Sequence, residues 1–104
     1  MTKEEELYLA IGKKLQGAES SQMFGKPCLK INGKAFACFF QQCMVFKLTG
    51  NDYTAALSLA GAQLFDPSGK GHPMKEWVQI PCEYADEWKK YAMVAYAYVK
   101  EVPK

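Results

Sequence analysis

Arginine is missing from this 104-residue chain: all 13 basic residues are lysine, and 11 acidic residues bring the net charge down to +2. Arginine makes the bidentate contacts with guanine and phosphate, so its absence argues against sequence-specific DNA recognition. A single histidine and the lack of any Cys-x-x-Cys spacing leave no ligand pattern for a metal ion. We therefore predict no catalytic, cofactor or metal site, and expect that the chain is not an enzyme.

Long hydrophobic runs are missing too, although 49% of the residues are hydrophobic. No stretch reaches the length of a membrane-spanning helix, and the first residues are acidic, unlike those of a signal peptide. The length fits a single domain over residues 1–104. We expect a cytoplasmic protein with no membrane contact and with reduced thiols rather than disulfides at Cys28, Cys38, Cys43 and Cys82.

The centre of the chain, residues 28–48, predicts three consecutive antiparallel strands. Asn32-Gly33 is typical of a two-residue type I′ turn, in which both residues take a positive φ. Such a turn pairs Leu29 with Phe36, and side chains then alternate between the two faces of the sheet. The predicted apolar face consists of Leu29, Ile31, Phe36, Cys38 and Phe40. In this register Cys28 lies opposite Ala37 and on the other face from Cys38.

The second turn of this central segment lies near Gln41 and Gln42. A three-residue loop, Gln41 to Cys43, is favoured over a two-residue loop because it keeps one face wholly apolar. Residues 44, 46 and 48 then join that face. The opposite face is predicted to be wet; it carries Lys30, Asn32, Ala35, Ala37 and Lys47, with Phe39 as its apolar exception.

The flanking segments predict helices and short strands. A first helix starts after Thr2, the expected N-cap, and ends at Gly17, and residues 18–22 form a polar link. The other expected elements are a helix at 53–60, strands at 62–65 and 75–80, and a last helix from Pro81 to Pro103. The predicted fold is α+β, a two-layer α-β-β-β-α-β-β-α order with helices packed on an antiparallel sheet.

Four short segments of the chain, taken in their order and spacing, resemble the pattern of a known family. They are Met23-Phe24-Gly25, then Gly33 followed by Phe36-Ala37, then Phe46-Lys47-Leu48, and last Trp77-Val78-Gln79-Ile80-Pro81 before an alanine-rich helix. In this order and spacing they resemble the N-terminal domain of the TfoX (Sxy) family of competence regulators, over residues 6–99. The chain departs from the family where Lys26-Pro27-Cys28 replace the further Gly and Tyr that often follow Met-Phe-Gly.

The resemblance implies an α+β fold, a bacterial origin and no known catalytic motif. Full-length competence regulators carry a second, C-terminal domain of the helix-hairpin-helix type, and residues 1–104 are expected to lack it. The competence role is therefore not transferred with the resemblance.

Three lysines are predicted to share the wet face of the central strands: Lys26, Lys30 and Lys47, with Phe39 among them. Basic residues interleaved with an aromatic ring on a sheet face suit single-stranded nucleic acid. The alternative is that these lysines only solubilise an exposed face, which the near-neutral net charge favours.

The last helix contains nine uncharged residues, Tyr91 to Val99. A helix that is apolar nearly all round is either buried on every side or covered by a partner. Because tyrosine is favoured at interfaces, we predict a self-association surface at Tyr91, Val94 and Tyr98, and a homodimer. A fully buried central helix in a monomer explains the same pattern.

Two weaker candidates lie in the second half of the chain. Lys70 and His72 stand in a glycine-containing loop that suits an anion, although its spacing is not that of a Walker phosphate loop. Cys82 starts the last helix and is a candidate reactive thiol, while the nearby Glu83 opposes that reactivity.

Three functions follow as hypotheses. The first is a non-enzymatic regulatory module that contacts an unknown protein partner. The second is a weak nucleic-acid-binding regulator that uses the lysine-bearing sheet face, and the third is a thiol-based enzyme or redox protein.

Overall fold

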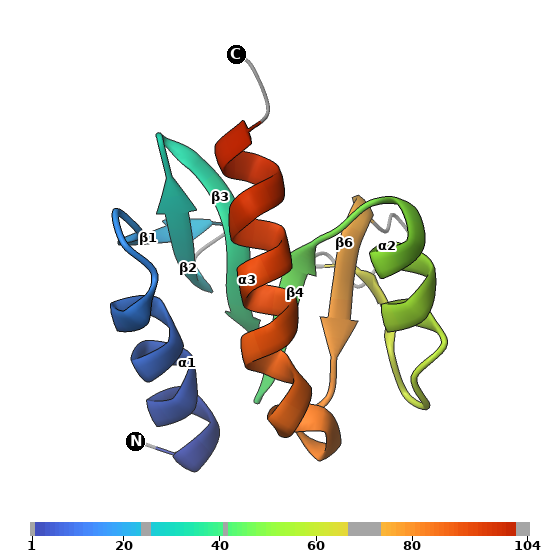
Figure 1. The fold of residues 1–104 in the computed structure, drawn as a ribbon. Coiled ribbons are helices and arrows are strands. Elements are labelled where there is room, and N and C mark those ends of the chain that lie inside the picture. Colours follow the sequence, from blue (N-terminus) through green and yellow to red (C-terminus); the bar gives the residue numbers. More distant parts are fainter. Residues whose placement is uncertain (1, 24–25, 41, 67–73, 102–104) are drawn as a thin grey trace.

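The computed structural model describes residues 2–23, 26–40, 42–66 and 74–101, and its helices pack on one face of a sheet (Figure 1). The helices are α1 (Lys3–Lys14), α2 (Gly50–Leu57), the 3₁₀-helix η1 (Cys82–Tyr84) and α3 (Ala85–Glu101). The strands are β1 (Glu19–Met23), β2 (Lys26–Ile31), β3 (Lys34–Phe40), β4 (Cys43–Lys47), β5 (Gln63–Phe65) and β6 (Met74–Ile80). The α+β class is as predicted.

The strands form one six-stranded sheet in the order β1-β2-β3-β4-β6-β5, and each pair is antiparallel. Strands β1 to β4 follow one another as a meander. The chain then passes through α2 and β5 and returns along β6, which pairs with β4. Met44 therefore lies beside Ile80, and the start of β4 lies next to the segment that leads into α3.

Strand β1 occupies most of the segment that the sequence predicts as a polar link. Its residues Glu19, Ser20 and Gln22 are exposed, and it pairs with β2 along its full length. The sequence signal is weak because an edge strand with little buried surface shows no apolar alternation. The sequence predicted five strands, and it missed this edge strand.

The register of β2 with β3 differs from the prediction because of a β-bulge. Asn32 and Gly33 have φ values of 53° and 79°, which confirms the tight turn. The register then shifts between Leu29 and Lys30, and Phe36 becomes the extra residue of β3. A bulge moves every residue beyond it to the opposite face. Side chains 37 to 40 therefore lie on the faces opposite to those predicted.

The turn between β3 and β4 was also predicted wrongly. Phe40 pairs with Cys43, so the loop has two residues rather than three. Gln42 takes a φ of 63°, which lets the short turn form without a glycine. This second one-residue difference cancels the first, so Met44 and Phe46 lie on the face of Leu29 as predicted. Between the two, Phe39 lies on the helix-covered face, whereas Cys38 and Phe40 lie on the other.

The main core lies between the sheet and the helices, with α3 crossing β3 and β4 (Figure 1). Its buried residues on α3 are Trp88, Tyr91, Ala92, Ala95 and Val99. The indole N–H of Trp88 donates to the carbonyl of Ile80 at 3.2 Å, which satisfies its one polar atom. On α1, Tyr8 packs against Phe39 with ring centroids 5.4 Å apart. No helix within the described ranges is long and apolar enough to cross a lipid bilayer.

A second, smaller core lies on the opposite face of the sheet, hereafter the open face. It contains Cys28, Cys38, Val45, Phe65 and Trp77, and Ala35 and Phe40 pack against it. None of these residues comes from a helix. Both faces of the sheet are therefore packed, one by helices and the other by side chains of the strands themselves.

Candidate interaction surfaces

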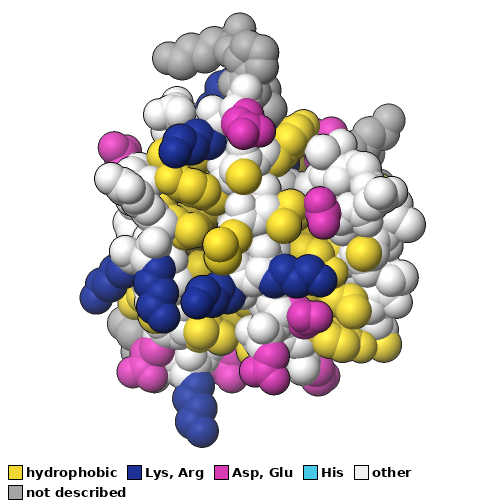
Figure 2. Space-filling view, in the orientation of Figure 1, with side chains coloured by type: hydrophobic (Ala, Val, Ile, Leu, Met, Phe, Trp, Pro, Cys, Tyr) yellow, Lys and Arg dark blue, Asp and Glu magenta, His cyan; other side chains and the backbone are white. Residues whose placement is uncertain are grey.

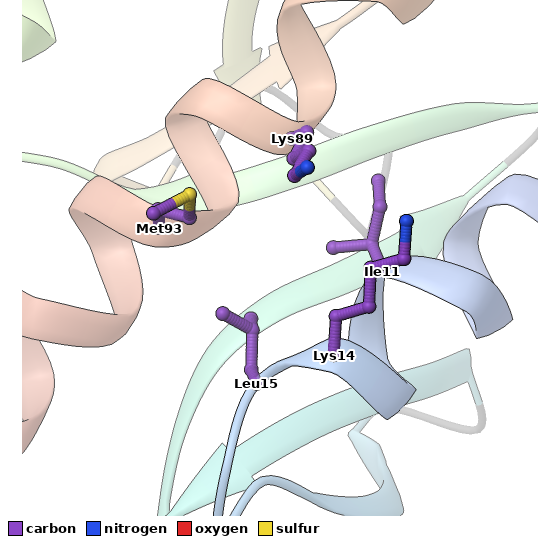
Figure 3. Close-up of a pocket in the computed structure, with 5 residues that line it drawn as sticks. All are labelled: Ile11, Lys14, Leu15, Lys89 and Met93. Atoms are coloured by element: carbon purple, nitrogen blue, oxygen red, sulfur yellow. The ribbon is translucent and has the colours of Figure 1, made fainter.

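An apolar groove lies between α1 and α3 on the helix layer. Its volume is about 210 Å³, and it is lined by Ile11, Lys14, Leu15, Lys89 and Met93. Figure 3 shows these side chains meeting from the end of α1 on one side and from α3 on the other. Ligand pockets for drug-sized molecules measure roughly 300–1,000 Å³. This groove is therefore the size for one or two side chains rather than for a cofactor.

The two walls of the groove come from α3 and from the C-terminal end of α1. Lys89 and Met93 are four residues apart on α3 and share a face, whereas on the other wall Ile11 comes from α1 and Leu15 from the C-cap that directly follows it. Ile11 is buried, whereas Met93 is 52% exposed and is the one large apolar side chain exposed in the described residues. An exposed methionine beside an apolar floor is typical of adaptable binding surfaces.

One lysine lines each wall of this groove, Lys14 from α1 and Lys89 from α3. Lys13 and Lys14 occupy the last turn of α1, where the negative end of the helix dipole favours cations, and Lys89 and Lys90 project from α3. Figure 2 shows lysine side chains crossing this face of the molecule beside apolar surface. Neither Lys14 nor Lys89 forms an ion pair within the part of the chain that the structure describes. The groove thus combines an apolar floor with unneutralised positive charge at its rim.

The predicted self-association residues lie elsewhere. Tyr91 is 3% exposed and packs on Phe46 with centroids 6.2 Å apart, so it belongs to the core and cannot form an outer surface. Val94 and Tyr98 are half-buried, and both pack against the main core. The exposed side of α3 is instead formed by Asp86, Lys89, Lys90, Met93, Ala97, Lys100 and Glu101. Alanine-rich spacing could not show which side of the helix faces the sheet.

The three lysines predicted to share a sheet face do so. Lys26 and Lys30 alternate with the buried Cys28, and Lys47 lies opposite Trp77, so all three are on the open face. Phe39 was assigned to this face wrongly, because the bulge turns it toward the helices. The aromatic rings beside these lysines are Phe40, with the Lys26 Nζ 5.3 Å from its centroid, and Trp77, with the Lys47 Nζ at 5.9 Å.

These rings are poorly available for stacking with bases. Trp77 is only 7% exposed, Phe65 is fully buried, and Phe40 is half-buried beneath Lys26. A single-stranded nucleic-acid platform needs ring faces open to the solvent. The open face therefore offers positive charge but little stacking surface.

The four cysteines are free thiols that lie as two neighbouring pairs. The first pair contradicts the predicted register. Cys28 lies directly opposite Cys38, on the same face, and both are fully buried. Burial raises the pKa of both thiols, and that of Cys38 rises from 9.0 to about 12. Such thiols stay protonated near neutral pH and behave as small apolar side chains.

The second pair lies nearer the surface. Cys43 is half-buried and Cys82 is exposed, and the backbone N–H of Cys82 hydrogen-bonds the sulfur of Cys43. Cys82 lies in η1, three residues before the start of α3, rather than in the first turn of that helix. Its Sγ is 3.8 Å from the Glu83 Oε1.

Lys70 and His72 lie outside the described residues. Among the residues that are described, no three His, Cys, Asp or Glu side chains are placed to hold a metal ion. A second, more open depression of about 380 Å³ lies beside α2; it is lined by Leu48, Thr49, Gly50, Tyr53, Leu64 and Glu76.

Comparisons with known proteins add no functional assignment. No family model matches this chain, and no curated protein or solved structure matches it either. The resemblance to the TfoX N-terminal domain rests on the sequence segments alone.

Proposed function

We propose that this chain is a non-enzymatic regulatory module of the TfoX N-terminal type that binds another protein through the α1–α3 groove. The observation that carries the proposal is Met93, which is 52% exposed at the edge of an apolar groove, while no other large apolar side chain in the described residues is exposed. A flexible methionine at the edge of a concave apolar floor suits an apolar side chain of a partner. The groove was not foreseen from the sequence.

The positive charges at the rim of the groove indicate what kind of partner fits it. Lys14 and Lys89 flank the floor that Ile11 and Leu15 provide. A partner with one or two apolar anchor residues, flanked by Asp or Glu, places its carboxylates against these ammonium groups and its anchor in the groove. We therefore propose an acidic amphipathic helix as the occupant. The contact area is small, so we expect an affinity in about the micromolar range.

A peptide pair tests this proposal. The probe is a fluorescent helical peptide with two leucines four residues apart and glutamates beside them; the matched peptide carries lysines in place of the glutamates. We expect the acidic peptide to bind about tenfold or more tightly than the basic one at physiological salt. Met93→Ser should weaken binding by about tenfold, because it removes roughly one buried apolar side chain from the contact.

The control variant is Lys30→Glu, which changes a lysine on the open face and should leave peptide binding unchanged. Equal binding of the two peptides, or unchanged binding to Met93→Ser, would contradict the proposal. Sedimentation of the wild type at high concentration covers the homodimer hypothesis. A dimer that Met93→Ser dissociates would show that the occupant of the groove is a second copy.

The nucleic-acid hypothesis is the second candidate, and one observation favours it: Lys26, Lys30 and Lys47 lie together on the open face. Its test is titration of fluorescent single-stranded DNA at low and physiological salt. Binding that weakens steeply with salt and is lost in Lys26→Glu/Lys47→Glu would support it. The buried state of Trp77 and Phe65 makes us expect weak binding without base stacking.

A further inference from the structure

Cys43 and Cys82 are brought together by the sheet although they are far apart in the sequence. Met44 pairs with Ile80 in the β4–β6 ladder, so Cys43, one residue before Met44, lies at the point where β6 passes into η1. Cys82 is the first residue of η1. This junction is the place where the end of the sheet leads into α3.

Specific contacts hold the two thiols at this junction. The backbone N–H of Cys82 and the side chain of Gln79 both hydrogen-bond the sulfur of Cys43, and the two thiol groups interact electrostatically. Hydrogen bonds to a sulfur fix the side-chain rotamer that presents it. These contacts place the Cys43 sulfur beside the backbone of Cys82.

Exposure separates this pair from the other one. Cys82 is exposed and Cys43 is half-buried, whereas Cys28 and Cys38 have no exposed surface. Oxidation of cysteine depends on access for the oxidant and on a second thiol close enough to resolve the first product. The junction satisfies both conditions, and the buried pair does not satisfy the first.

We propose that Cys43 and Cys82 form a reversible intramolecular disulfide when the protein meets hydrogen peroxide. The exposed Cys82 thiolate attacks the peroxide oxygen: an S–O bond forms, the O–O bond breaks, and one water leaves after protonation. Cys43 then attacks the sulfur of Cys82: an S–S bond forms, the S–O bond breaks, and hydroxide leaves with the Cys43 proton as a second water. The thiols lose two electrons in total, and the peroxide gains them.

The disulfide would join the start of β4 covalently to the segment that leads into α3. It constrains the unfolded chain over a long loop, so the oxidised protein should be more resistant to unfolding than the reduced protein. The main core and the α1–α3 groove need no rearrangement, because both cysteines lie outside the main core. The inference therefore stands independently of the proposed protein-binding role.

The experiment treats the whole chain with hydrogen peroxide, blocks the remaining thiols with iodoacetamide and measures the intact mass. We expect a monomer with two of its four cysteines blocked, two hydrogen atoms lost, and full reversal by dithiothreitol. Cys43→Ser and Cys82→Ser should each abolish the loss, while Cys28→Ser, a change in the buried pair, should retain it. Circular dichroism of each variant checks that it is folded.

Other products overturn the proposal. Four alkylated cysteines after treatment would show that no disulfide forms. A bond that persists in Cys43→Ser and Cys82→Ser would assign the oxidation to Cys28 and Cys38 instead. A dimer on a non-reducing gel that only Cys82→Ser removes would show an intermolecular bond, and sulfinic acid on Cys82 alone would show that Cys43 does not reach it.

Discussion

The two faces of the sheet bury apolar side chains by different means. On the helix-covered face, large residues of α1, α2 and α3 meet large residues of the strands, such as Phe46 and Met44. On the open face the buried residues nearest the middle of the sheet are small, namely Cys28, Cys38 and Val45, and aromatic rings from the strands lie around them. A sheet face without a helix layer can thus bury its central side chains when these are small and aromatic rings surround them.

The edge-to-face contact of Phe40 with Phe65 shows how this is done. Their centroids are 5.2 Å apart although β3 and β5 are separated by β4 and β6 in the sheet. Phe65 follows a register shift in the β5–β6 ladder. The shift lets an edge strand place its ring over the sheet, where it takes the place of a helix side chain.

Phenylalanine occurs fully buried on both faces, which allows a matched comparison between Phe46 and Phe65. We expect Phe46→Ala to lower the free energy of unfolding by about 3–5 kcal/mol, since the cavity is enclosed by sheet and helices. Phe65→Ala should cost about 2–3 kcal/mol, because a site at the rim of a face without helices relaxes more easily. Urea unfolding monitored by circular dichroism measures both.

Equal losses for the two variants would show that the open face is as rigid as the main core. Met93→Ala serves as the control, and we expect it to change the free energy of unfolding by less than about 0.5 kcal/mol, because this side chain is largely exposed.

Alkaline pH should destabilise the folded protein through the buried Cys38 thiol on the open face. Burial raises the pKa of Cys38 from 9.0 to about 12, so folding favours the protonated thiol. The stabilisation is complete below pH 9 and is lost as the pH rises toward 12, at about 1.4 kcal/mol per pH unit for one group. Urea unfolding in the presence of a reductant between pH 8 and pH 10 should show this decline, and Cys38→Ala should make it shallower.

Met93→Ala supplies the control for that measurement. It removes no titratable group, so it should leave the slope unchanged. An identical pH dependence in wild type and Cys38→Ala would place the alkaline sensitivity in other groups, such as Tyr8, whose pKa burial also raises.

The smallest expected effect concerns the lysine that covers Phe40. The Nζ of Lys26 lies 5.3 Å from the ring centroid, a cation–π contact at the surface. Lys26→Ala should lower the free energy of unfolding by about 0.5–1 kcal/mol. Lys30→Ala, on the same face but without a ring contact in the described residues, should change it less. A larger loss for Lys30→Ala would mean that lysine stems in general, rather than this contact, protect the open face.

Much of the fold could be predicted from the sequence because local chemistry specified it. Thr2 caps α1 through a hydrogen bond from the Glu5 N–H at 3.1 Å, as the capping pattern indicates. The Asn32-Gly33 turn formed as predicted. These signals act within a few residues, where sequence reasoning is strongest.

The errors in the predicted strand register arose at a bulge and at a turn. Neither position carries the residue type that usually marks such a feature. Phe36 is not a usual marker of a bulge, and Gln42 is not a usual residue for a positive φ. The α1–α3 groove depends on how two helices lie against each other, and the Cys43–Cys82 pair depends on the β4–β6 ladder. Both come from long-range contacts that no local pattern contains.

The polar edge strand β1 has a consequence for how the molecule behaves at high concentration. An unpaired strand edge is a template on which further chains add and grow into fibres. Here one edge of the sheet exposes Glu19, Ser20 and Gln22, and the other is β5, which is three residues long. Neither edge strand offers a long, flat, apolar template. We therefore expect that the sheet does not polymerise through its exposed backbone edges.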